Sequence, residues 1–68
     1  MITIEEFIEQ AKLAQIKHPE LRWGQVLYNQ LATSRPDLAY RLMGTDADPF
    51  HEDWRTRIFF KWLAENWD

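Results

Sequence analysis

The aromatic content of residues 54–67 most constrains what this chain can fold into. Seven large apolar side chains fall in a stretch without Gly or Pro, namely Trp54, Ile58, Phe59, Phe60, Trp62, Leu63 and Trp67. At about 100° per residue they cover roughly 240° of a helix circumference, whereas an ordinary core-facing stripe is about 100° wide. One neighbouring helix cannot cover that surface. Either a very small fold wraps this helix, or part of its face belongs to a partner.

The length of 68 residues predicts a single domain over residues 1–68, because a second hydrophobic core could not be built from the remainder. Ordering such a chain costs on the order of 100 kcal/mol, which the buried apolar area barely offsets. Four Trp, four Phe and two Tyr therefore carry much of the stability. The chain has no Cys and needs no oxidising compartment, so we expect a cytoplasmic location.

The charge pattern bears on the class of partner. A net charge of -3 with scattered basic residues argues against nucleic acid, because phosphate-binding surfaces normally show a basic excess or stripe. No apolar run approaches membrane-spanning length, and the first residues lack the basic region and apolar block of a signal peptide. The sequence therefore predicts neither a membrane-spanning nor an exported chain.

Helix signals organise the first half of the chain. Thr3 and Glu6 form a capping-box pattern, which predicts a helix from there to about residue 16. His18 and Pro19 should end it, because a residue before proline is pushed out of the helical region.

A second helix is predicted over residues 20–33, where Trp23, Leu27 and Leu31 recur at four-residue intervals. Gly24 either weakens this helix by about 1 kcal/mol relative to Ala or permits close packing against another backbone.

The second half begins with a restart signal, in which Ser34 is a cap or near-cap and Pro36 occupies the first turn of a short third helix. Gly44 should end that helix in a left-handed conformation. Residues 45–52 are predicted as a loop, and Asp53 as the cap of the last helix. No strand-like alternation is present, so the predicted fold class is all-α, a compact single domain of about four short helices.

The predicted core follows from helical spacing. Its members are Trp23, Leu27, Leu31, Leu38, Leu42, Phe50, Ile58, Phe59, Trp62 and Leu63. Phe60 and Trp67 fall on the far side of the last helix and, with Trp23, are the candidate partner surface, because aromatic residues dominate interface hot spots. The alternative is that Phe60 and Trp67 also belong to the core, as a small Trp-rich domain could require.

A carboxylate cluster between the last two helices raises the question of a metal site. Its members are Asp46, Asp48, Glu52 and Asp53, with His51 among them. The spacing does not fit a calcium loop, since counting from Asp46 places Phe50 fifth and Arg57 twelfth, where oxygen ligands are required. Two His and no Cys do not make a zinc site. We expect no metal and no cofactor, with Asx turns at Asp46 and Asp48 and Phe50 tucked into the core.

No catalytic or DNA-reading pattern emerges. Ser34 is the one serine and is better explained as a cap, and His18 as a solvated helix-terminal residue, so we expect no enzyme. The second and third helices resemble a helix-turn-helix only superficially, because the supposed recognition helix begins with Pro36 and the acidic Asp37.

Several motifs occur together over about residues 21–67, namely R-x-G-Q, N-x-L, R-P-D-L-A, G-T-x-x-D-P-F and a closing W-L. In this combination they resemble a group of short uncharacterised bacterial and prophage-associated proteins. The resemblance implies a common small helical fold and a phage setting, and no catalytic residues. We therefore expect a small protein-binding domain, a phage or mobile-element accessory factor modulating a host protein. The alternatives are a self-associating structural protein and, third, a nucleic-acid-binding protein.

Overall fold

The computed structural model describes residues 2–67. The elements in chain order are α1 (Ile4–Lys17), α2 (Trp23–Ser34), α3 (Pro36–Leu42), a short 3-10 turn η1 (Asp53–Arg55) and α4 (Thr56–Asn66). These residues contain no strand, and the four helices form a compact globule. The prediction of an all-α fold with four short helices is confirmed. None of the helices in this part of the chain has the length and apolar character needed to cross a membrane.

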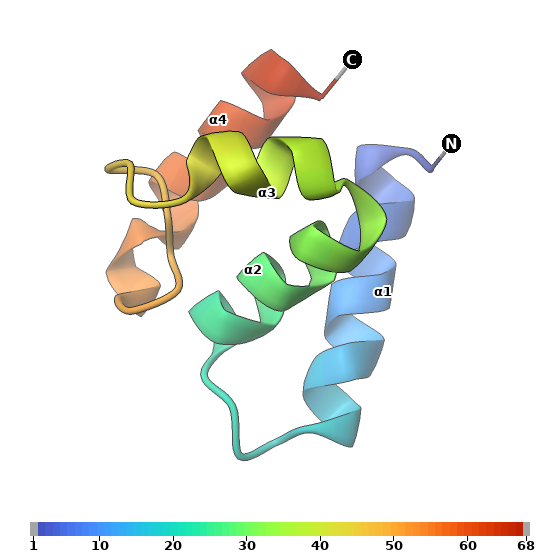
Figure 1. The fold of residues 1–68 in the computed structure, drawn as a ribbon. Helices are drawn as coiled ribbons and strands as arrows, with labels where there is room; N and C mark the ends of the chain where they lie inside the picture. The colour runs from blue at the N-terminus through green and yellow to red at the C-terminus, as the bar shows by residue number, and fades with distance from the viewer. Residues whose placement is uncertain (1, 68) are drawn as a thin grey trace.

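Helix α2 lies at the centre of the fold (Figure 1). α1 packs along one side of it, and α3 follows after a single residue, Arg35, which caps both helices. The loop after α3 then leads to α4, whose last turn returns toward the start of α1 (Figure 1). Segments from both ends of the chain therefore share one core.

The core combines six predicted residues with others that were not predicted. Fully buried predicted residues are Leu27, Leu31, Leu38, Leu42, Phe59 and Leu63, whereas Trp23, Phe50 and Trp62 are half-buried. The prediction is wrong for Ile58, which is 41% exposed. Sequence spacing missed the buried Phe7, Ala11, Val26, Ala39 and Ala47.

The first helix begins as its sequence predicts. The backbone N–H of Glu6 donates to Thr3 Oγ1 at 3.1 Å, and the N–H of Thr3 donates to Glu6 Oε1 at 3.0 Å. The capping box is confirmed. The helix continues one residue beyond the predicted end, to Lys17, and His18 caps it.

The predicted start of the second helix is wrong. α2 begins at Trp23 rather than residue 20, because Leu21 N–H bonds back to the carbonyl of His18 in a turn. Arg22 then precedes the helix, and its N–H donates to Gln25 Oε1 at 3.0 Å. Ser34 is the last residue of α2 and directly precedes Arg35, the N-cap of α3, so it is a near-cap, and Pro36 lies in the first turn of α3 as predicted.

Asp53 does not cap the last helix. Residues 53–55 form η1, and α4 starts only at Thr56. The Asp53 carboxylate instead accepts the N–H of Gly24 at 3.0 Å, in the first turn of α2. Gly24 is buried there, and a Cβ on it would lie 2.1 Å from the carbonyl oxygen of Pro49. The predicted close packing of Gly24 against another backbone is confirmed.

Candidate functional site

The three residues predicted as a partner surface all pack against the core. Phe60, Trp67 and Trp23 are half-buried, which leaves less free surface than the sequence suggested. The Phe60 ring meets Phe59 edge to face at 5.2 Å between centroids. Trp23 lies apart from the other two, at the start of α2. Their contact with a partner stays a prediction. The expectation that Phe60 and Trp67 are exposed on the far side of α4 is corrected, because both are half-buried.

Trp67 makes ring contacts and hydrogen bonds with several other parts of the molecule. Its ring lies 5.7 Å from that of Phe7, and the Arg35 guanidinium lies 5.2 Å from its centroid. The indole Nε1 donates to the carbonyl of Ile2 at 3.2 Å, and Arg35 Nη1 donates to the Trp67 carbonyl at 2.7 Å. This side chain therefore joins both ends of the described chain rather than projecting into solvent.

The exposed apolar surface of α4 lies on a different side. Phe59 and Leu63 are fully buried and define the core-facing direction, and Phe60 and Trp62 flank it at about 80° on either side. Ile58 lies about 120° from that direction. Ile58 is therefore left partly in solvent, and Trp54 in the preceding turn is 66% exposed.

A hollow, here called the α4 hollow, adjoins this exposed surface. It encloses about 340 Å³ between α4 and the loop that follows α3. Its lining residues are Thr45, Asp46, Ala47, Ile58, Lys61, Trp62 and Glu65. Apolar side chains thus meet three charged ones of both signs, the combination of apolar centre and polar rim that protein interfaces show.

Trp62 is braced by contacts from α3 and from its own helix. The Arg41 guanidinium lies 5.8 Å from the indole centroid, and its Nη2 donates to Asn66 Oδ1 at 2.8 Å. Asn66 Nδ2 in turn donates to the Trp62 carbonyl at 2.9 Å. The Arg41 guanidinium over the ring is thus the contact that orients the indole lining the hollow.

The loop wall of the hollow is fixed by a closed set of hydrogen bonds. Gly44 has φ +79°, which confirms the predicted left-handed helix end. Its N–H donates to Asp48 Oδ2, while Asp48 Oδ1 accepts from Phe50 N–H, each at 3.0 Å. The predicted Asx turn at Asp48 is therefore confirmed. Ala47 between these residues is only 5% exposed, so the loop presents a firm surface.

The Trp54 side chain is exposed, but contacts with its neighbours fix its orientation. Its Nε1 donates to Glu52 Oε2, and the Arg55 guanidinium lies 5.1 Å from its ring centroid. Arg55 also pairs with Glu52 at 3.4 Å and donates to the Thr45 carbonyl at 3.3 Å. An exposed but oriented indole loses little conformational entropy on binding, which favours it as an interface anchor.

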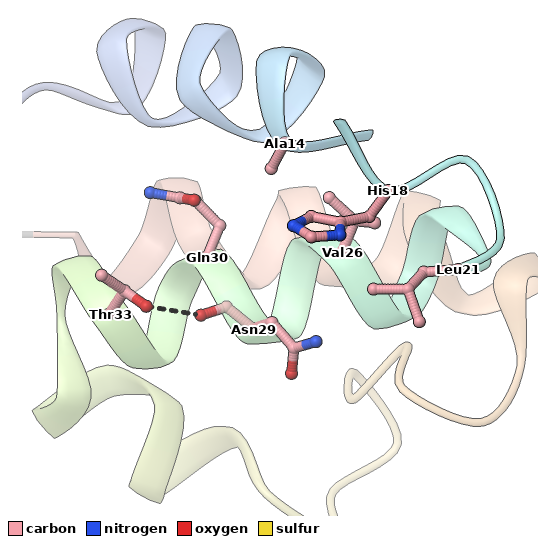
Figure 2. A pocket seen from close by; sticks show the side chains of 7 residues that line it. All are labelled: Ala14, His18, Leu21, Val26, Asn29, Gln30 and Thr33. Atoms are coloured by element: carbon pink, nitrogen blue, oxygen red, sulfur yellow. Dashed lines mark hydrogen bonds between the residues drawn. The ribbon is translucent and has the colours of Figure 1, made fainter. Parts of the chain in front are cut away.

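A second hollow lies between α1 and α2 (Figure 2). It encloses about 250 Å³ and is lined by Ala14, His18, Leu21, Val26, Asn29, Gln30 and Thr33. His18 is its one titratable side chain and lies 3.5 Å from Glu20, outside the lining. The Thr33 hydroxyl donates to the carbonyl of Asn29 at 3.1 Å. This lining pairs no nucleophile with a base.

The carboxylates between α3 and α4 bind different partners within the protein. Within residues 2–67, no three His, Asp or Glu side chains come together in a way that could hold a metal ion. Asp53 turns toward Gly24 and Glu52 toward Arg55, while Asp48 closes its own loop. These acids have structural partners in three different directions.

Compared with known protein families, curated proteins and solved structures, the chain has no match. The resemblance to prophage-associated proteins therefore stays a prediction. What can be inferred about function rests on the geometry described above.

Proposed function

We propose that this chain is a small non-enzymatic protein-binding domain that docks a partner on the outer face of α4. The observation that carries the proposal is the exposure of Ile58 in the lining of the α4 hollow, with the exposed Trp54 four residues before it in the chain. Aromatic residues in braced positions next to a hollow are the usual anchors of protein interfaces. Ile58 and Trp62 would form the centre, and Lys61 and Glu65 the polar rim.

The proposed setting follows from the sequence resemblance. We place the protein in the cytoplasm as an accessory factor of a phage or mobile element that modulates a host protein. A factor of this kind acts through a contact surface and needs no active site.

Paired affinity captures from a bacterial lysate test the proposal. The bait is the native chain, the double variant Trp54→Ser with Ile58→Ser, or the control Tyr40→Ser. Tyr40 is 75% exposed on α3, so the control removes a comparable exposed ring elsewhere. Circular dichroism checks that each bait is folded, which we expect because neither substitution opens a cavity.

The expected result is a protein retained by the native chain and by Tyr40→Ser but lost with the double variant. Removing two anchors should weaken binding by about 2 kcal/mol or more, roughly thirtyfold. Identical captures for all three baits would refute the α4 surface.

A further inference from the structure

The outer face of α1 carries a second exposed apolar patch. Leu13 is 58% exposed and Ile16 is 75% exposed, one turn apart on the helix. Both belong to α1, the helix that packs on α2 by its opposite face through Phe7 and Ala11. This patch belongs to a different helix from the α4 surface, so it calls for a separate explanation.

The charged residues around this patch are acidic in the first half of α1 and basic in the second half. Glu5, Glu6 and Glu9 lie in the first half of α1, and Lys12 and Lys17 in the second half, all exposed. The Glu9–Lys12 ion pair spans 3.6 Å with both side chains mostly in solvent. Exposed pairs of this kind contribute little stability, so these groups remain available to other partners.

Glu9, Leu13 and Lys17 form one row of side chains at four-residue spacing, with an acid, an apolar residue and a base in that order. Rows of this type are the ridges through which packed helices interdigitate. Glu9 and Lys17 are each one turn, about 6 Å, from Leu13. A twofold axis at Leu13 would therefore bring Glu9 of one copy opposite Lys17 of the other, twice.

We infer that α1 pairs with α1 of a second copy of this chain, antiparallel, with Leu13 at the twofold axis. The row is complementary to itself only in this orientation, because a parallel arrangement would oppose acid to acid and base to base. Twofold interfaces require such self-complementarity. A contact through one helix per copy is small, so the dimer is weak and concentration-dependent.

Charge exchange along the row tests the inference. Glu9→Lys gives two bases flanking Leu13, and Lys17→Glu gives two acids, so each variant should repel itself. An equimolar mixture of the two variants should pair, because every opposed charge is then opposite in sign. The matched controls are Asp37→Lys and Arg57→Glu, which change the net charge equally at exposed positions of α3 and α4 outside the α4 hollow.

Sedimentation equilibrium from micromolar to millimolar concentrations measures the outcome, with circular dichroism confirming that each variant is folded. We expect a monomer–dimer equilibrium for the native chain and both controls. Each variant alone should show a dissociation constant raised about tenfold or more, and the mixture should recover native affinity.

A native chain that stays monomeric throughout would overturn the inference. So would a dimer indifferent to both variants, or a mixture that fails to pair. None of these results depends on the α4 surface, whose test uses a foreign protein.

Discussion

Gly24 is the position where a single methyl group tests the packing of the fold most directly. Its N–H donates to Asp53 Oδ1, and an added Cβ would lie 2.8 Å from that oxygen and 2.1 Å from the carbonyl oxygen of Pro49. Because the Pro49 contact is to backbone, no change of rotamer relieves it. Gly24→Ala must therefore push residues 49–53 away from α2.

Three effects combine in the change that Gly24→Ala makes to the free energy of unfolding. In an unobstructed helix interior, Gly→Ala would stabilise by about 1 kcal/mol. Overpacking costs about 1–3 kcal/mol, and loosening a hydrogen bond to a carboxylate costs about 1.5–3 kcal/mol. The expected net loss is about 1.5–5 kcal/mol. An unfolding entropy of about 2.1 cal/mol/K per residue makes each kcal/mol worth about 7 °C in this chain, so Tm should fall by about 10–35 °C.

Thermal unfolding followed by far-UV circular dichroism measures this change. Ala32→Gly is the matched control, because Ala32 is exposed on the same helix and reports helix propensity alone. That control should lose about 1 kcal/mol. If Gly24→Ala raises Tm instead, propensity outweighs the clash, and the loop does not pack against α2 as described.

Three further predictions address other regions of the fold. Gly44→Ala meets no atom within 4 Å, so its loss should be only the cost of the left-handed conformation, about 1–2 kcal/mol by thermal melting; a gain would contradict this. Leu63→Ala should cost about 2–5 kcal/mol and Ile58→Ala under about 1 kcal/mol, and equal losses would contradict the position of the core face on α4. The hydrogen bond from Arg35 holds the pKa of Asp37 below its usual 3.8, so carboxyl NMR should find a lower midpoint. The stability that this bond gives the native chain over Asp37→Asn is present above pH 3.8 and should disappear as pH falls through the lowered pKa, which denaturant titrations at several pH values would check.

Local signals in the sequence predicted local structure well. The capping box at Thr3 and Glu6 and the left-handed Gly44 each depend on residues within four positions along the chain. Asp48 and its turn are equally local. Such features can be read from sequence because the partner groups are already adjacent before the chain folds.

The hydrogen bond of Asp53 could not be predicted from local sequence. Its carboxylate accepts the N–H of Gly24, which is 29 residues away, and nothing near Asp53 in sequence indicates that contact. Residues 53–55 form η1 instead of the first turn of α4, so a sound cap pattern was assigned to the wrong helix.

The core-facing side of α4 could not be predicted from sequence for a different reason. Seven apolar positions over 240° fit more than one choice of core direction, and spacing alone could not decide between the Ile58–Trp62 edge and the Phe60–Trp67 edge. The decision comes from Phe7 on α1, whose ring lies 6.3 Å from Phe59 and 5.7 Å from Trp67. A helix distant in sequence therefore selects which apolar residues are covered, and the candidate site moves to those left outside.

The bond from the Trp67 indole to the Ile2 carbonyl has a consequence for how the protein is made. The two residues are 65 positions apart, and the same indole also covers Phe7. Phe7 leaves the ribosome well before Trp67, so during synthesis the Phe7 ring lacks the cover of this indole while α2 and α3 are already available. The domain should complete its folding only after nearly the whole stretch has emerged, and a nascent chain stalled before Trp67 should remain open to proteases and chaperones.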